Sequence, residues 1–247
     1  MITTATKAII AAVVQKAAED RGGMWAGPAA GLIMGGINSA TPEFLRAVAA
    51  LCKKHDLLLL IDEVQAGFGR CGDAMAWRMI APEVEPDGIS WAKGMGGGVP
   101  IGSFWLSDRA IDADGTALSS LMGPGSHGST YGGNPLVCAA SLAVLKEIRE
   151  QNLASHAIRM ETRIRETILS WKLPVITEIR GSGLLLGVAL DPAFIPTPEG
   201  KTPALVVVSK LMELGLLVPP AGPNTIRLLP PLNITADEID AALAILR

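Results

Sequence analysis

Residues 57–64 read LLLLIDEV and decide the fold, because five consecutive apolar residues are followed here by two acids. An apolar run without alternation is typical of a strand that is buried on both faces of a parallel sheet. Ligands bind outside the carboxyl ends of the strands in such sheets, which makes Asp62 a candidate site residue. A solvated carboxylate at the end of a surface strand explains its position equally well.

The segments around this strand predict alternating helices and strands. Residues 41–56, TPEFLRAVAALCKKHD, predict a helix because Thr41 is a suitable N-cap and Pro42 suits the first helical position. Short strands are expected over residues 88–91 and 101–106, and a second capped helix over residues 134–150. The apolar stripe of the first helix is predicted to comprise Phe44, Val48, Leu51 and Cys52.

The last hundred residues have a different pattern. After a helix over about 154–171, PVITEIR, a Gly-Ser-Gly turn and LLLGVAL predict a hairpin over residues 174–190. Thr235 and Glu238 form the pattern of a capping box at the start of the final helix. A helix over residues 204–215 and strands over residues 216–220 and 225–232 complete the expected elements. We expect an α/β fold, with a mostly parallel sheet in residues 1–150 and a smaller α+β domain in residues 151–247.

Composition excludes several classes of function. The 247 residues carry a formal charge of −3, and only 4% are aromatic, which gives neither a basic surface nor stacking platforms for nucleic acid. Three widely spaced cysteines and three histidines match no zinc-binding spacing, so we expect no metal and read the cysteines as reduced thiols of a cytoplasmic protein. No apolar run approaches the ~20 residues that span a membrane. Residues 1–21 favour an amphipathic helix over a signal peptide.

Lys93 lies between a short apolar stretch and a glycine-rich turn, in GISWAKGMGGGVPIG. An amine that is partly shielded from water there would be a nucleophile for an aldehyde. Taken alone, an ordinary loop lysine is the more common explanation. A phosphate loop of the NTPase kind is disfavoured because its lysine follows the glycines instead of preceding them.

Ser129 and Thr130 lie in HGSTYGGNP, just before a predicted helix, where hydroxyls and free backbone N–H groups suit a phosphate. A capping turn explains them equally well. Together with Asp62 and Lys93 they fit pyridoxal 5′-phosphate (PLP). In that interpretation the lysine bonds the aldehyde, the carboxylate keeps the ring nitrogen protonated, and the hydroxyls hold the phosphate.

With these motifs, the chain resembles the class III aminotransferases of PLP fold type I. The stretches that carry the resemblance include HDLLLLIDEVQAGFGRCG, EPDGISWAKGMGGGVPIG, HGSTYGGNPLVCAASLAVL, IRGSGLLLGVAL and TIRLLPPLNIT. They run in order from about Ala40 to Arg247, and the acetylornithine aminotransferase subgroup is the most similar. Ornithine, 4-aminobutyrate and diaminobutyrate aminotransferases are close relatives.

The resemblance implies a role for each matching residue. Lys93 corresponds to the lysine that bonds the cofactor and moves the proton, and Asp62 to the partner of the ring nitrogen. Val64 corresponds to a residue packed on the ring, and Gln65 to one near its hydroxyl. The implied reaction moves an amino group from N-acetylornithine, or a similar ω-amino donor, to 2-oxoglutarate. This is a step of the arginine-biosynthesis type.

Further implied residues concern the phosphate and the substrate. Thr130, with Ser129 beside it, corresponds to a residue that reaches the phosphate bound in a second subunit, which implies a homodimer with shared sites. Arg227 corresponds to an arginine that binds a substrate carboxylate, for which a planar fork has the right shape.

The chain also departs from the family pattern. We expect it to lack the family's N-terminal part, which carries a phosphate loop, a ring-stacking aromatic and another carboxylate-binding arginine. GLIMGGINSATPEF lacks an acidic stretch, and Cys71 stands where threonine is usual. One alternative is therefore a catalytically inactive fragment of such an enzyme. Another, an unrelated small α/β binding protein, would require the ordered motifs to match by accident.

Overall fold

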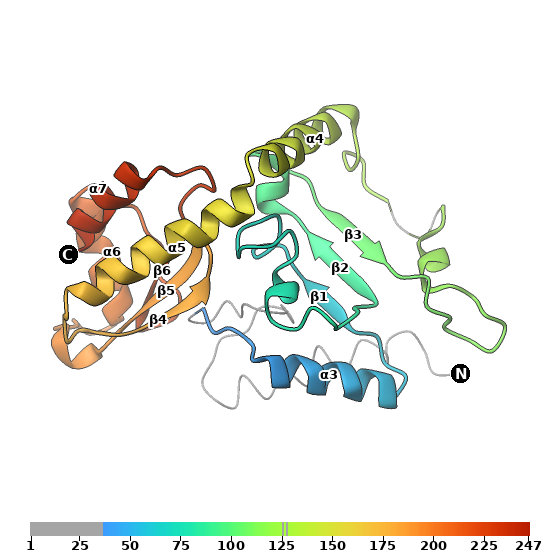
Figure 1. The fold of residues 1–247 in the computed structure, drawn as a ribbon, viewed down its shortest axis with the longest axis horizontal. Helices are drawn as coiled ribbons and strands as arrows, with labels where there is room; N and C mark the ends of the chain where they lie inside the picture. The colour runs from blue at the N-terminus through green and yellow to red at the C-terminus, as the bar shows by residue number, and fades with distance from the viewer. Residues whose placement is uncertain (1–36, 125, 127) are drawn as a thin grey trace.

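The computed structural model describes residues 37–124, 126 and 128–247, so the amphipathic helix expected in residues 1–21 lies outside the described part. Two three-stranded sheets lie side by side, and α4 and α5 run across from one toward the other (Figure 1). The α-helices are α3 (Pro42–Lys54), α4 (Pro135–Glu150), α5 (Leu153–Ser170), α6 (Pro203–Glu213) and α7 (Ala236–Leu246). The strands are β1 (Leu60–Asp62), β2 (Gly88–Trp91), β3 (Ser103–Leu106), β4 (Ile176–Ser182), β5 (Leu185–Leu190) and β6 (Thr225–Leu228). Short 3₁₀ helices are η1 (Ala76–Met79), η2 (Lys93–Gly96), η3 (Leu118–Met122) and η4 (Pro192–Phe194).

The first sheet has the order β1-β2-β3 and is mixed. β1 and β2 are parallel, with Asp62 opposite Ser90, whereas β3 runs antiparallel to β2. The expected α/β class is confirmed, although only one of the two strand pairs in this sheet is parallel. Because β1 and β2 are parallel, their carboxyl ends lie at the same edge of the sheet, and this edge carries both Asp62 and the segment that contains Lys93.

The helix α3 begins where its sequence predicts, but it buries only part of the predicted face. The Thr41 hydroxyl accepts a hydrogen bond from the Phe44 amide at 3.2 Å, which satisfies one of the free N–H groups of the first turn. Leu45 and Cys52 are buried, while Phe44 and Leu51 are 45% and 51% exposed. The predicted stripe is therefore wrong at Phe44 and Leu51, but it is confirmed at Cys52, and Val48 packs against the same core.

A partly buried ion pair fixes the start of the first sheet. One carboxylate oxygen of Asp87 accepts hydrogen bonds from the Leu59 amide at 2.8 Å and from the Arg109 guanidinium at 3.0 Å. Arg109 also donates to the Leu57 carbonyl and to Asp56. This cluster joins the segment that precedes β1 to the segment that follows β3. It therefore helps to fix the position of β1, and with it the position of Asp62 at the end of that strand.

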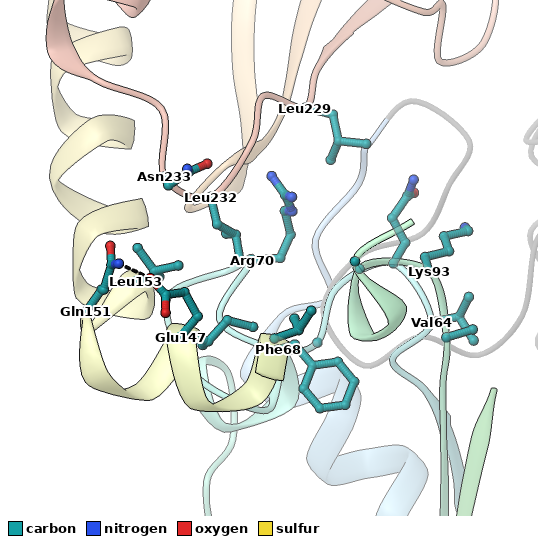
Figure 2. Close-up of a pocket in the computed structure, with 17 residues that line it drawn as sticks. Val64, Phe68, Arg70, Lys93, Glu147, Gln151, Leu153, Leu229, Leu232 and Asn233 are labelled. Carbon is teal, nitrogen blue, oxygen red and sulfur yellow. Dashed lines mark hydrogen bonds between the residues drawn. The ribbon is translucent and has the colours of Figure 1, made fainter. Parts of the chain in front are cut away.

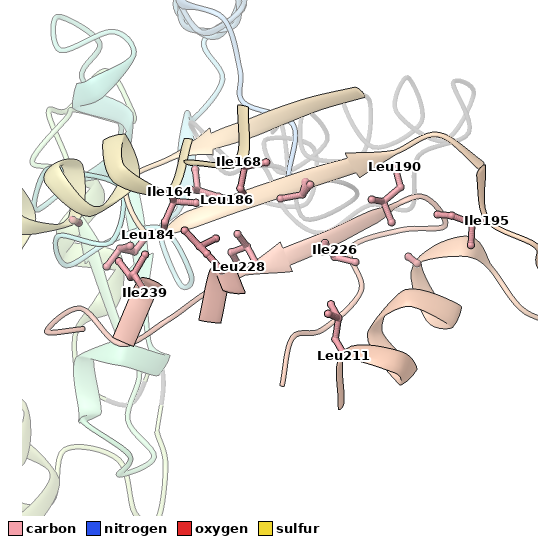
Figure 3. Packing of buried hydrophobic residues seen from close by; sticks show 14 residues of the cluster. Ile164, Ile168, Leu184, Leu186, Leu190, Ile195, Leu211, Ile226, Leu228 and Ile239 are labelled. Atoms are coloured by element: carbon pink, nitrogen blue, oxygen red, sulfur yellow. The ribbon is translucent and has the colours of Figure 1, made fainter. Parts of the chain in front are cut away.

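The second sheet, of order β4-β5-β6, is antiparallel throughout and carries the largest buried cluster (Figure 3). Leu186 and Val188 of β5 point into the cluster together with Ile164 and Ile168 of α5 and Ile239 of α7. All six residues of β5 are buried, as expected for a central strand with both faces covered. The predicted hairpin and the predicted capping box of α7 are confirmed.

The opposite face of β5 holds the loop that follows β1. Leu185 forms a small buried cluster with Ala66, Cys71 and Ala76. The Leu184 amide donates to the Arg70 carbonyl at 2.8 Å, and the Ser182 hydroxyl donates to the Cys71 carbonyl at 2.9 Å. The β4–β5 hairpin therefore serves as the support for residues 66–76.

Other sequence expectations had mixed outcomes. Residues 216–220 form no strand: Pro220 makes only an isolated bridge to Ile226. A strand with two prolines at its end loses the N–H groups that a ladder needs. The three cysteines are unpaired thiols, and in the described part of the chain no helix is both long and apolar enough to cross a bilayer. The division at residue 150 stays a prediction.

Candidate active site

Asp62 is the last residue of β1, and hydrogen bonds hold its carboxylate in place. One oxygen accepts from the Val64 amide at 2.8 Å and from the Ser90 hydroxyl of β2 at 3.3 Å. A partly buried carboxylate needs compensating partners. Among the described residues no cation forms an ion pair with Asp62, and these two hydrogen bonds compensate its burial instead.

Glu63 points to the opposite face of the strand and is 1% exposed. Its two carboxylate oxygens accept from the backbone amides of Ala76, at 2.8 Å, and Trp77, at 3.0 Å. Burial raises the pKa of this carboxyl to about 7, although the two amides lower it. Glu63 therefore joins the end of β1 to η1, and this role was not predicted. An acid directly after a buried apolar run was the available signal.

Lys93 begins η2, directly after β2, and has a left-handed backbone with φ 50°. A non-glycine residue in this region costs about 1–3 kcal/mol, and such strain is concentrated at functional sites. The side chain is exposed, so the predicted shielding of its amine from water is not found. A Cβ on Gly97 would lie 2.7 Å from Val144 of α4, so only glycine lets this turn pack so closely on the helix.

A cavity of about 500 Å³ opens beside Lys93, a size usual for small-molecule sites (Figure 2). Val64 and Gln65 line it together with Lys93, as the sequence interpretation required. The opposite wall comes from α4 and from the segment after β6, and contains Val144, Glu147, Ile148, Gln151, Leu229, Leu232 and Asn233. Asp62 is not among the lining residues.

Arg227 belongs to β6, and its side chain contacts Gln65. Its Nη1 is 3.4 Å from the Gln65 Oε1, and its buried Nε has no hydrogen-bond partner among the described residues. Burial lowers the pKa of this guanidinium. Arg227 does not line the cavity itself, but it contacts a residue that does.

Ser129 and Thr130 are exposed and do not line the cavity. The Ser129 hydroxyl accepts a hydrogen bond from the Gly132 amide at 3.1 Å. This is the geometry of a capping turn, the alternative explanation for these hydroxyls. The N-cap of α4 is Asn134, which accepts from the Val137 amide at 3.2 Å. The structure therefore does not bring these two hydroxyls together with Lys93 in one chain.

Arg70 is a site residue that sequence reasoning missed. It lines the cavity, and its Nη1 donates to the carbonyls of Leu184, at 3.2 Å, and Pro230. These acceptors are 114 and 160 residues away in the sequence, so no local pattern indicates them. Burial lowers the pKa of the guanidinium.

The arrangement suits a planar ring that carries an aldehyde and a basic nitrogen. The accessible amine of Lys93 and the fixed carboxylate of Asp62 lie at the ends of neighbouring parallel strands. Val64, two residues after Asp62, adds an apolar side chain to the cavity wall. The described residues of the cavity offer no hydroxyl for a phosphate, so that end of such a ligand would have to be held by other parts of the protein.

Comparisons with known proteins agree with this arrangement. The family model for class-III aminotransferases matches residues 4–247, which extends the match well before Ala40. The chain is 39% identical to the acetylornithine aminotransferase of Bacillus subtilis over 214 residues, which are 86% of this chain and 50% of that protein. It is 40% identical to the acetylornithine aminotransferase of Caldanaerobacter subterraneus, over 86% of this chain and 49% of that protein.

Solved structures give the same result. An ornithine aminotransferase from Toxoplasma gondii, with PLP at its active site, superposes with a TM-score of 0.72 at 35% identity, covering 86% of this chain and 47% of that one. An N-acetylornithine aminotransferase from Stenotrophomonas maltophilia has a TM-score of 0.70 at 32% identity, with 86% and 52% covered. The chain thus spans about half the length of the relatives it matches.

Proposed function

Because the chain belongs to the class-III aminotransferases, we propose that it takes part in the PLP-dependent transfer of an amino group, with Lys93 as the residue that bonds the cofactor. One observation carries this proposal. Lys93 and Asp62 follow neighbouring parallel strands at the same edge of a sheet, beside a cavity that Lys93, Val64 and Gln65 line.

The residues present suit the reactive end of PLP. Lys93 offers its amine to the aldehyde, and Asp62 offers a carboxylate to the ring nitrogen. The Val64 side chain would pack on the ring, and the Gln65 amide would lie near its hydroxyl. The left-handed backbone of Lys93 supports this role, because strain of this kind persists where a site needs it.

When bound, PLP supplies a ring that accepts electrons from the substrate carbon that loses a proton. The Lys93 amine would take that proton from the substrate Cα and would hold it for return later in the reaction. The Asp62 carboxylate would keep the proton on the ring nitrogen. The hydrogen bonds from Val64 and Ser90 support this task, because they hold the carboxylate in one orientation.

We propose an ω-amino donor and a keto-acid acceptor as substrates, specifically N-acetylornithine and 2-oxoglutarate. Arg227 would bind a substrate carboxylate, and its buried Nε, which has no hydrogen-bond partner in the part of the chain that the structure describes, supports an anionic ligand nearby. The similarity to ornithine aminotransferases supports ornithine as the alternative donor.

We also propose that two copies of the chain share their sites. Ser129 and Thr130 lie outside the cavity of their own chain, which suits hydroxyls that reach a phosphate in the second copy. Large apolar residues within about a dozen positions of them in the sequence are exposed, as at a surface that a partner covers. They are Leu121, Met122, Tyr131, Leu136 and Leu142.

An amino-transfer assay tests the proposed activity. The purified chain with PLP, N-acetylornithine and 2-oxoglutarate should form glutamate, and Lys93→Ala should abolish the product. Lys172→Ala is the matched control, because Lys172 is an exposed lysine with φ 52° outside the site. Equal rates in wild type and Lys93→Ala would reject the role of Lys93.

A second candidate is a chain that binds the cofactor but does not complete turnover. It is favoured by the cavity, whose described lining residues offer no hydroxyl to a phosphate. It predicts that PLP becomes attached to Lys93 while no glutamate forms above the Lys93→Ala background. Exchange of the substrate Cα proton with solvent, measured by NMR, would separate a half-reaction from complete inactivity.

A further inference from the structure

Glu63 carries the most deeply buried charged group among the described residues, and the proposed chemistry gives it no task. Its side chain is 1% exposed and lies on the face of β1 opposite Asp62. Gly67 and Trp91 of β2 close over it, because a Cβ on Gly67 would lie 3.1 Å from the Glu63 Oε2 and 3.0 Å from the Trp91 Cδ1. The carboxylate therefore has little contact with solvent.

The charge of Glu63 has no compensating cation. In the part of the chain that the structure describes it forms no ion pair, and the two carboxylates that act on it, those of Asp62 and Asp73, repel it. The Cys71 thiol is also close enough to interact with it, while Trp91, which faces it from β2, carries no charge. A buried carboxylate that lacks a cation is costly to maintain.

Two backbone amides offset part of this cost. The carboxylate oxygens accept from Ala76 at 2.8 Å and from Trp77 at 3.0 Å, the first two amides of η1. Met75, the residue before η1, makes no side-chain cap bond, so Glu63 caps this turn from the end of β1. Burial nevertheless outweighs the amides and raises the pKa of Glu63 to about 7.

The loop after β1, residues 66–76, leads into η1 and forms part of the cavity wall. Phe68 and Arg70 of this loop line the cavity (Figure 2). The Phe68 amide donates to the Ala74 carbonyl at 2.9 Å, which closes the loop on itself and lets it move as one unit. Phe68 also has a left-handed backbone with φ 55°, a conformation that persists only where surrounding contacts hold it. Release of the η1 amides removes one of these contacts.

Opening of this loop is linked to the proton on Glu63. When η1 moves away, the carboxyl reaches water, and its pKa returns toward the ordinary value of 4.5. A group that holds its proton more tightly in the closed state favours closing while it is protonated and opening once it is ionised. The open fraction of the loop should therefore rise as the pH rises from about 5 to 7.

We infer that Glu63 is a positioning residue whose gain or loss of one proton sets how tightly the loop after β1 closes the cavity wall. The neutral carboxyl keeps the loop closed, and the carboxylate, which has given its proton to the solvent, favours the open form. The inference rests on the proposed function for what the cavity binds. The loop movement itself needs neither PLP nor substrate, so it can be measured on the chain alone.

Hydrogen–deuterium exchange, followed by mass spectrometry, measures the opening on the full chain without PLP. Rates for peptides that cover residues 64–77 are taken from about pH 5 to 8 and divided by the rates of the unfolded peptides at the same pH. We expect this ratio to rise about 10- to 100-fold in wild type. It should change less than about twofold in Glu63→Gln, whose side chain is neutral throughout. A peptide from β5 should exchange more slowly than the loop at every pH.

Backbone NMR shows whether Glu63 itself is responsible. The amide protons of Ala76 and Trp77, which bond its two oxygens, should shift with a common midpoint at a pH of about 7 in wild type. They should not shift in this range in Glu63→Gln. If circular dichroism shows that this variant is unfolded, the wild-type amides still test the inference, because the absence of a common midpoint would reject it.

Glu161→Gln is the matched control. Glu161 also accepts from a backbone amide, that of Gly183, in the turn that packs on the same loop. Its charge differs in being compensated, because the Arg165 guanidinium lies 2.7 Å away. This variant should therefore keep the rise in exchange that we expect in wild type.

Four results would overturn the inference. They are a level exchange ratio in wild type, the same rise in Glu63→Gln, the loss of the rise in Glu161→Gln, and equal rates in the loop and in β5, which would mean that the whole chain unfolds. Because no cofactor is present, each of these failures is separate from a failure of Lys93 to bond PLP.

Discussion

Replacing Gly183 by alanine tests how closely the loop after β1 is held against the β4–β5 hairpin. Gly183 lies in the hairpin turn with φ 57°, and a Cβ there would lie 2.3 Å from the Arg70 carbonyl oxygen and 2.9 Å from the Cys71 Cα. These contacts involve backbone, which cannot rotate away as the end of a side chain can. The loop that carries Arg70 would have to move.

The expected loss of stability has two parts. The left-handed conformation costs a residue with a Cβ about 1–2 kcal/mol. Forcing two packed backbone segments apart costs about 1–3 kcal/mol, as in other overpacked sites. We therefore expect Gly183→Ala to lower the free energy of unfolding by roughly 2–5 kcal/mol, a large part of the total for an ordinary domain.

The assay is urea unfolding followed by circular dichroism, with the same fit for each variant. Gly200→Ala is the matched control, because Gly200 has φ 77° and no atom within 4 Å of the position of a Cβ. It should lose only the conformational part, about 1–2 kcal/mol. Equal losses in the two variants would refute the close packing of the hairpin turn on residues 70–71.

Three further predictions concern the supports of the site. The pKa of Glu63 is about 7 in the folded chain, against its ordinary value of 4.5. The folded state therefore keeps the proton to higher pH than the unfolded state does. The free energy of unfolding should fall, by at most about 3 kcal/mol, as the pH rises from about 5 to 7. Urea unfolding across this range should show a smaller slope in Glu63→Gln, and identical slopes would contradict the assignment. Asp87→Ala removes a buried acceptor from Leu59 and Arg109 and should cost about 2–3 kcal/mol in chemical denaturation; a loss under about 0.5 kcal/mol would count against the cluster. Thr235→Ala breaks the capping box of α7 and should cost about 1 kcal/mol in the same assay, with no change meaning that the cap is not used.

Features that depend on local chemistry could be predicted from the sequence. Thr41, Asn134 and Thr235 each begin a helix at the predicted position, because a cap needs only its own side chain and the next three amides. β5 could be predicted as the second strand of a hairpin, because LLLGVAL follows directly on a Gly-Ser-Gly turn.

Features that depend on distant partners could not be predicted. The core face of α3 is set by which side meets β1, and the sequence offers apolar residues on two faces. Similarly, Glu63 is explained by amides 13 and 14 residues away, and Arg70 by carbonyls more than 100 residues away.

The candidate site falls between these cases. Asp62 could be placed at a strand end and Lys93 just after a short strand, whereas their meeting at one sheet edge comes from the parallel pairing that the structure shows. The hydroxyls of Ser129 and Thr130 could not be placed, since a glycine-rich segment has no periodicity to fix its path. Their role stays a prediction that depends on a second copy of the chain.

The attachment of PLP to one lysine is the measurement that bears most directly on the whole account. The chain is mixed with PLP, treated with borohydride to make the attachment permanent, digested, and mapped by mass spectrometry. We expect the added mass on Lys93, and its loss in Lys93→Ala but not in Lys172→Ala. Modification of a different lysine, or none at all on a folded chain, would contradict the account.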